Sequence, residues 1–281
     1  MAFDLKRSQQ TFQRLDRELA KLAKKPAPEH VHKFRTNSRR VEALLSEVTS
    51  QCNRNDEKLL KLLSRLRKKA GRVRDLDVQI AALRALKFPE ANGHKAQLMD
   101  ALIDERTKHE KKLANAFDAA TVCEIRKRLK RAAHHLDVPA RTDLLALTIK
   151  KLRELSREHA PLTENTLHEY RIIGKRARYV AEFAGDDAEA KKLVEQLKRL
   201  QDVIGDWHDW LKLTQRAEEL LGNVRDSALV AMLRNVTQAK FRQSLSAVAQ
   251  HRSEFAKHKY AVRPVRDEKK LAKAASQTAA A

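Results

Sequence analysis

The chain has 281 residues, of which 42% are hydrophobic, so it can bury a sizeable core in one large domain or in two smaller units. Its 59 Lys and Arg residues against 37 Asp and Glu residues give a formal net charge of +22. The excess positive charges repel one another, which favours a polyanionic partner. Aromatic residues make up only 5% of the chain, which weighs against RNA-binding modules that stack bases on aromatic rings.

The expected compartment is the cytoplasm. Cys52 and Cys123 are too few for a disulfide framework or a cysteine-rich zinc site, and they fit a reducing environment. The first residues, MAFDLKRSQQTFQRL, lack the apolar core of a signal peptide. No later run approaches the roughly 18 apolar residues of a membrane-spanning helix, so no membrane partner is expected.

Helical periodicity runs along nearly the whole chain, which contains only six glycines and six prolines. It is interrupted where proline, glycine and small polar residues gather, at 24–30, 87–94, 136–141, 159–165, 184–187 and near Gly222. Thr163 or Asn165 is expected to cap the helix that follows the fourth break, and residues 228–255 are expected to form one long helix. No segment alternates convincingly with period two. The sequence therefore predicts an all-α fold.

Two segments of the chain resemble each other. VHKFRTNSRRVEALL at 31–45 corresponds to LHEYRIIGKRARYVA at 167–181, and LSRLRKKAGRVRDLDVQIAAL at 63–83 corresponds to LKRLQDVIGDWHDWLKL at 197–213. Glycine and aspartate share an offset of 134 residues in the second pair, where Gly71 and Asp75 match Gly205 and Asp209. This internal repeat predicts a first unit over 1–140 and a second over 141–262. Residues 263–281 are basic and alanine-rich with little to bury, and we expect this tail to be disordered.

In each repeat the cations follow one face of a helix. At about 100° per residue, Arg35 and Arg39 fall within about 60° of His32, whereas the apolar residues of the segment lie on the far side. His168, Arg171 and Lys175 repeat the arrangement, at an offset of 136 residues. A charged helix face is usually only solvated. Here it occurs twice with few acidic partners four residues away, which favours a binding groove.

The helix that follows each stripe differs between the two units. In the first unit four cations run down one side of the helix, opposite a row of leucines and a valine: Lys61, Arg65, Lys68 and Arg72. In the second unit only Arg199 keeps its position, and the other places are taken by Glu195, Asp202 and Asp206. We therefore expect two halves of unequal charge.

These residues resemble the CHAD domain, an all-helical family named for its histidines. The resemblance lies in the pattern H-x-x-R-x-x-x-[RK]-R, which occurs at 32–40 and 168–176, and in the GRVRD and GDWHD segments that follow. It covers essentially residues 5 to 260. It implies two pseudo-symmetric four-helix bundles around a basic central groove or pore that binds inorganic polyphosphate, often on intracellular polyphosphate granules.

The candidate polyphosphate-binding residues combine the matched motifs with the cations of the following helices. They are His32, Arg35, Arg39, Arg40, Lys61, Arg65, Lys68, Arg72, His168, Arg171, Lys175, Arg176, Arg178 and Arg199. Two positions depart from the family pattern. Glu42 stands where the first motif usually has another basic residue, and Lys175 replaces an arginine, which exchanges a planar fork of donors for a point charge.

Rows of Arg and Lys suit polyphosphate because a phosphate polymer needs many cations along a line and little stereochemical discrimination. Neighbouring cations are expected to keep the motif histidines neutral, and a bound polyanion should reverse that bias, so affinity should increase as the pH falls toward 6. The alternative partner is nucleic acid, whose phosphates also favour the binding of a basic protein because counterions are released. No zinc-finger spacing or recognition-helix signature supports it.

Catalysis, cofactors and metal ions are not expected. His134 and His135 are adjacent, so on a helix they point about 100° apart and cannot easily share an ion. His208 and Asp209 lie beside Gly205 in the repeat, where a structural role is favoured. The chain has neither a G-x-x-x-x-G-K-[ST] loop nor an H-E-x-x-H motif.

Overall fold

The structure is a computed structural model that describes residues 3–24, 27–88, 93–139, 142–157, 162–222 and 227–257. Over these ranges the chain forms nine α-helices, one π-helical turn and one 3-10 turn, with no strand, which confirms the all-α prediction. The elements are α1 Leu5–Lys24, α2 Pro28–Ala43, η1 Leu44–Val48, α3 Arg54–Ala85, α4 His94–Ala114, η2 Asn115–Phe117, α5 Ala119–His134, α6 Leu144–Arg157, α7 Glu164–Ala181, α8 Ala188–Leu221 and α9 Ala228–Lys257. The predicted tail at 263–281 lies outside the described residues.

Polar side chains set the beginnings of several helices. Thr163 caps α7 and forms a reciprocal capping box with Thr166, so Thr163 and not Asn165 is the cap. Asn53 accepts hydrogen bonds from the first turn of α3, and Asp187 does the same for α8. Asp118 caps α5 by accepting from Thr121 N. Because Asp118 starts a new helix there, the described residues form five α-helices in the first half of the chain and four in the second.

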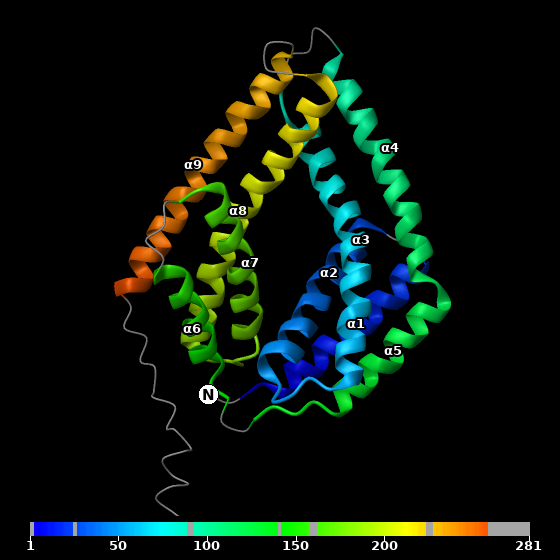
Figure 1. Ribbon diagram of the computed structural model, residues 1–281, viewed down its shortest axis with the longest axis vertical. Helices are drawn as coiled ribbons and strands as arrows, with labels where there is room; N and C mark the ends of the chain where they lie inside the picture. Colours follow the sequence, from blue (N-terminus) through cyan, green and yellow to red (C-terminus); the bar gives the residue numbers. More distant parts are fainter. Residues whose placement is uncertain are drawn as a thin grey trace, which may run out of the picture.

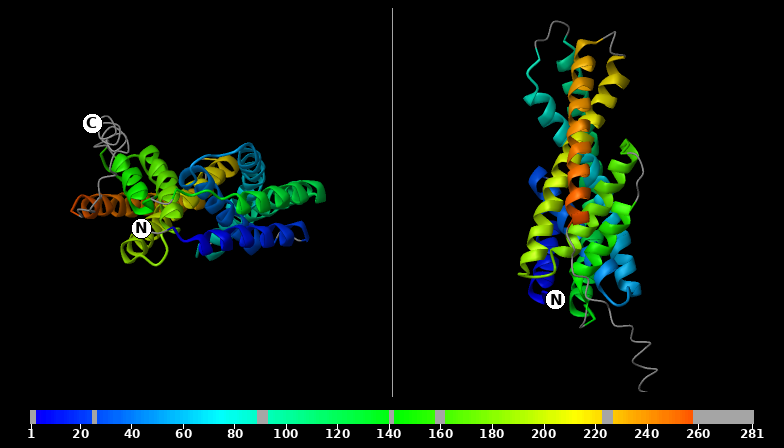
Figure 2. Two further views of the ribbon diagram at one scale, coloured as in Figure 1. Left: turned by 90° about the horizontal axis from the view of Figure 1, so that it is seen from below. Right: turned by 90° about the vertical axis from the view of Figure 1, so that its left-hand side faces the viewer.

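The helices form a flat triangular frame, with α3 and α8 converging toward one apex and α4 and α9 along the outer edges (Figures 1 and 2). α3 has 32 residues and α8 has 34, so each is about 50 Å long and runs from the base of the frame to the apex. At the base, α7 packs against α2 and η1. The two halves therefore meet at the apex and again at the base.

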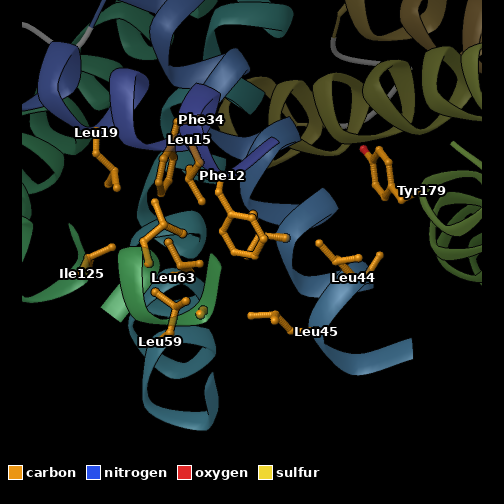
Figure 3. Packing of buried hydrophobic residues seen from close by; sticks show 14 of the residues in the cluster. Phe12, Leu15, Leu19, Phe34, Leu44, Leu45, Leu59, Leu63, Ile125 and Tyr179 are labelled. Atoms are coloured by element: carbon orange, nitrogen blue, oxygen red, sulfur yellow. The ribbon is translucent and has the colours of Figure 1, made fainter. Parts of the chain in front are cut away.

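Three hydrophobic clusters hold the frame together. The first joins α1, α2, α3 and α5 through residues such as Phe12, Leu15, Phe34, Leu63 and Ile125, and it also takes in Tyr179 at the end of α7 (Figure 3). The second lies among α6, α7, α8 and α9 and is built around residues that include Leu167, Leu197, Trp207 and Val248. The second cluster joins helices of the second half, whereas the first also takes in second-half residues such as Leu144, Val180 and Ala190.

The third cluster occupies the apex and mixes the two halves. Leu83 of α3 and Leu98 of α4 pack there with Leu213 of α8 and Leu233 of α9. The predicted division into two separate four-helix bundles is therefore not confirmed, because helices from both halves share one core at the apex. Among the described residues, no helix is both long and apolar enough to span a membrane.

Candidate functional site

A cavity of about 500 Å³ lies between the two halves, where α2 and α3 face α7 and α8. All four helices supply lining residues: α2 and α7, which carry the repeated motif, and α3 and α8, which follow them in the chain. We call it the larger cavity. Its lining residues are His32, Arg35, Thr36, Arg39, Arg74, Asp75, Val78, Arg171, Lys175, Arg178, Tyr179, Lys198, Gln201, Asp202, Gly205, Asp206 and Asp209.

A smaller cavity of about 310 Å³ adjoins it. Four residues line both cavities, Arg39 from α2 and Arg171, Lys175 and Tyr179 from α7. The smaller cavity is completed by Glu42, Ala43, Ser46, Glu47, Arg67, Ile172 and Arg176. Three cations at the junction of the two cavities therefore come from both copies of the motif.

Arg35 is held in place by α3. Its Nη1 donates to the backbone oxygen of Gly71 at 3.2 Å and to Oδ1 of Asp75 at 3.1 Å. A Cβ on Gly71 would lie 3.8 Å from the guanidinium carbon of Arg35, an ordinary van der Waals distance, so the guanidinium packs against this face of α3. Burial lowers the pKa of Arg35, although the nearby Asp75 carboxylate opposes the change.

Arg171, the counterpart of Arg35 in the second repeat, has no such anchor. Its Nε is buried and lacks a hydrogen-bond partner within the described part of the chain. Burial lowers the pKa of Arg171, and Asp209 is the largest charge that opposes this. The repeat thus places one arginine in a fixed contact and leaves its counterpart with a donor to spare.

Lys175 lies at the junction of the two cavities with its ammonium group desolvated. Burial is the main reason that its pKa falls to about 7, and the positive charges of Arg171, Arg39 and Arg35 lower it further. These four Arg and Lys side chains repel one another at close range, and the Asp209 carboxylate offsets that repulsion only in part. The arrangement is therefore suited to binding a group with several negative charges.

Four aspartates from α3 and α8 line the larger cavity: Asp75, Asp202, Asp206 and Asp209. Asp206 is 2.8 Å from the Nζ of Lys240 on α9, and Asp75 is paired with Arg35. Burial raises the pKa of Asp209, and the charge of Arg171 opposes that shift. Two of the four carboxylates are thus already paired with cations of the protein.

The two motif histidines lie in different surroundings. His32 lines the larger cavity, and its pKa is lowered by burial and then by Arg74 and Arg35. The ring of His168 lies 5.9 Å from the ring of His208 and outside both cavity linings. Burial, together with Arg171, lowers the pKa of His208 to about 4, so His208 is neutral at physiological pH.

Seven of the fourteen candidate residues line a cavity: His32, Arg35, Arg39, Arg171, Lys175 and Arg178 line the larger one, and Arg176 lines the smaller one. Arg40 and His168 line neither. The remaining five, Lys61, Arg65, Lys68, Arg72 and Arg199, are exposed and also lie outside both linings. These five side chains lie outside the cavities because they point in another direction from the helix axis. On α3 and on α8 they lie about 110° around the helix from the face that carries Gly71 or Gly205.

Sequence reasoning missed eight polar residues of α3 and α8 that do line the cavities: Arg67, Arg74, Asp75, Lys198, Gln201, Asp202, Asp206 and Asp209. The signal that could have found them is the repeated glycine and aspartate. Residues three or four positions from Gly71 and Gly205 share their helix face. Once Gly71 is placed against Arg35, the phase of the whole helix follows.

A family model for the CHAD domain matches residues 7–218, about three quarters of the chain. The chain belongs to the CHAD domain family. Its fold is similar to the crystal structure of the CHAD domain from the plant Ricinus communis, with a TM-score of 0.65 and 18% identity over 88% of each chain. It is also similar to PptA from Streptomyces chartreusis, with a TM-score of 0.64 and 16% identity over 89% of this chain and 96% of that one. No curated protein matches the sequence.

In this CHAD domain several buried polar atoms at the larger cavity lack a hydrogen-bond partner within the described residues. Arg171 Nε and both amide atoms of Gln201 are buried without a hydrogen-bond partner among the described residues, and Arg178 Nε has only a long ion-pair contact of 3.5 Å with Oε1 of Glu182. All three residues line the larger cavity. Since buried polar groups are normally paired, these atoms are available to a molecule in the cavity that could exchange hydrogen bonds with them.

Proposed function

We propose that this CHAD domain binds inorganic polyphosphate in the cavity between α2, α3, α7 and α8. The observation that carries the proposal is the set of buried polar atoms on Arg171 and Gln201 that lack a partner among the described residues, because both side chains line a cavity with further cations. Phosphoryl oxygens accept charge-assisted hydrogen bonds from such donors. The resemblance of the duplicated His-Arg motif to the family gives the same expectation.

The charge of the cavity supports a linear anion. Seven Arg and Lys side chains line the larger cavity against four aspartates, and the smaller cavity continues from it through Arg39, Arg171 and Lys175. A thin chain of phosphates can follow this row of cations from one cavity into the next. A nucleic-acid duplex is too wide for a space of about 500 Å³ and would be limited to the outer surface.

The proposal includes the finer features that the resemblance implies. The two copies of the motif act as a pseudo-symmetric pair, one on each side of the cavity, and the protein is recruited in the cytoplasm to polyphosphate granules. The domain binds the polymer and does not cleave it. Phosphate release from polyphosphate, measured with the pure protein in the presence of a divalent metal ion, should stay at the level of a blank.

The central test removes one arginine from each copy of the motif. The double variant R35A/R171A should bind labelled polyphosphate at least about a hundredfold more weakly at fixed salt, because each lost charge-assisted contact contributes about 1.5–3 kcal/mol. The matched control R65A/R199A removes the same charge from exposed positions outside the cavities and should change affinity less than about threefold. Equal effects in the two double variants would contradict the proposed site. Helical circular dichroism should be retained in both.

A competition experiment separates polyphosphate from nucleic acid. Long-chain polyphosphate should displace a labelled oligonucleotide at matched phosphate concentration, and the oligonucleotide should not displace polyphosphate. The reverse result would identify nucleic acid as the partner. The comparison is needed because counterion release favours the binding of any dense phosphate chain to a basic protein.

A further inference from the structure

In the first half of the chain, three polar side chains satisfy one another beside the smaller cavity. Arg67 on α3 donates from Nη1 to the hydroxyl of Ser38 at 3.2 Å and from Nη2 to Oε1 of Glu42 at 2.7 Å. Both acceptors lie on α2, so the contacts tie α2 to α3. The Arg67 guanidinium is therefore largely committed to internal partners.

The same three positions are filled differently in the second half. By the offsets of the repeat, Gln201 stands at the place of Arg67, Gly174 at that of Ser38 and Arg178 at that of Glu42. The arginine has become an amide, the hydroxyl has been lost, and the carboxylate has become a cation. None of the partners that satisfy Arg67 is present for Gln201.

Gln201 is consequently left without internal hydrogen bonds. Its side chain is only 5% exposed, and neither Nε2 nor Oε1 has a hydrogen-bond partner in the part of the chain that the structure describes. The Nε2 atom lies against Gly174, 3.7 Å from where a Cβ would stand. A buried amide is expected to be paired, so an unpaired one that lines a basic cavity points to a partner outside the chain.

We infer that Gln201, with Arg178 and the desolvated ammonium of Lys175, forms a phosphate subsite in the second half that the first half does not have. This inference rests on the proposed function. The amide Nε2 donates to a phosphoryl oxygen, and the Arg178 guanidinium and Lys175 ammonium balance its charge. The Oε1 atom accepts from water that accompanies the anion. In the first half the equivalent position is closed by the Arg67–Glu42 ion pair.

The subsite makes the binding surface unequal along its length. A polymer that lies across both halves is held more tightly where Gln201 and Arg178 are, and less tightly where Glu42 repels it. The unequal charge of the two halves therefore has a structural consequence. The more acidic helix, α8, nevertheless contributes the unpaired amide of Gln201, whereas the arginine at the same place on α3, Arg67, is already paired.

The test replaces the amide by a hydrocarbon of similar size. Gln201→Leu should weaken the binding of both tripolyphosphate and long polyphosphate about tenfold, because a hydrogen bond to a charged group is lost. Its thermal unfolding midpoint without ligand should be unchanged or higher, because the variant no longer buries an unpaired amide. The matched control is Gln79→Leu on α3, where the glutamine is also 5% exposed with an unpaired Oε1 but lines neither cavity. Its affinity should remain that of the wild type.

Two further variants keep the test decisive if the leucine variant folds poorly. Gln201→Glu keeps the shape but adds a negative charge and should weaken binding more than tenfold. Gln201→Arg should strengthen binding, because this arginine finds neither a serine nor a glutamate to hold it. If Gln201→Leu and Gln201→Glu bind as tightly as the wild type while R35A/R171A loses binding, the subsite is wrong and the proposed function stands. If the wild type binds no polyphosphate, both fail.

Discussion

The Nε of Arg40 on α2 donates to Oε2 of Glu182, directly after α7, at a distance of 2.6 Å. Glu182 is only 9% exposed, and Arg178 approaches its other oxygen at 3.5 Å. The ring of Tyr179 lies near both guanidinium groups, 6.0 Å from Arg40 and 4.9 Å from Arg178. Arg40 belongs to the motif that predicts phosphate contacts, but here it joins the two halves at the base of the frame.

Loss of Arg40 should therefore cost stability more than affinity. Arg40→Ala leaves the buried Glu182 carboxylate without its closest partner, and we expect the free energy of unfolding to fall by about 2 kcal/mol. The value lies below that for a fully buried pair because the Arg40 side chain is 28% exposed. Chemical denaturation measures the change. The control is Arg176→Ala, an exposed neighbour in the same motif position of the other repeat, which should shift stability by less than about 0.5 kcal/mol. Equal stability of the two variants would contradict the role of Arg40 in the joint.

Much of the fold could be predicted because the local signals agree with one another. A cap at Thr163 or Asn165, the long helix that begins at Ala228 and the repeated motif helices all follow from the sequence, and the structure selects Thr163. The apex core could not be predicted, since leucines such as Leu98 and Leu213 have the same helical spacing whichever partner they pack against. The extra helix of the first half depends on the Asp118 cap, a short polar signal inside an otherwise continuous helical pattern.

The site could be predicted for the motif helices and less well for the helices that face them. Apolar spacing identifies the buried face of α3, but it does not say which of the remaining faces borders a cavity. Arg67 and Arg65 are only two residues apart, and Arg67 lines the smaller cavity whereas Arg65 is exposed. The choice between them depends on the contact between Arg35 and Gly71, which is a tertiary feature.

The affinity for polyphosphate should fall as the pH rises through 7. The free domain holds the pKa of Lys175 at about 7 through burial and through the charges of Arg171 on its own helix and of Arg39 and Arg35 on α2, opposed by Asp209 on α8. A bound polyanion favours the protonated amine, so binding takes up a proton wherever free Lys175 is deprotonated. Affinity should be highest below pH 7 and decline toward pH 9.

Lys175→Arg provides the control for this pH dependence. An arginine stays charged throughout the range, so the variant should bind with nearly constant affinity between pH 7 and 9. A titration of labelled polyphosphate at four or five pH values would show the difference. A slope in the variant equal to that of the wild type would mean that another group, such as His32, whose pKa burial lowers, dominates.

The exposed cations of α3 should matter little for specific binding. Lys61, Arg65, Lys68 and Arg72 line neither cavity, and solvent screens their charge at physiological salt over about 8 Å. The quadruple variant to glutamine should bind less than about threefold more weakly at 0.15 M salt, with a larger change at low salt. A loss comparable to that of R35A/R171A at 0.15 M salt would show that polyphosphate follows the outside of α3.

Removal of the Glu42 charge should strengthen polyphosphate binding. Glu42 lines the smaller cavity and accepts from Nη2 of Arg67, so Glu42→Gln removes a repelling carboxylate and leaves Arg67 at most a neutral hydrogen bond, which a phosphate can displace. We expect a gain of about three- to tenfold and a loss of stability of about 1 kcal/mol, as is usual for a partly exposed ion pair.

A double-mutant cycle tests whether the gain acts through Arg67. Arg67→Met alone should change affinity little, because the guanidinium is already held by Glu42 and Ser38. In the Glu42→Gln background the same substitution should remove most of the gain, since Arg67 is then free to bind phosphate. Glu124→Gln, which releases Arg128 on α5 away from both cavities, is the matched control and should leave affinity unchanged. A gain that survives the loss of Arg67 would show that Glu42 acts only by repulsion.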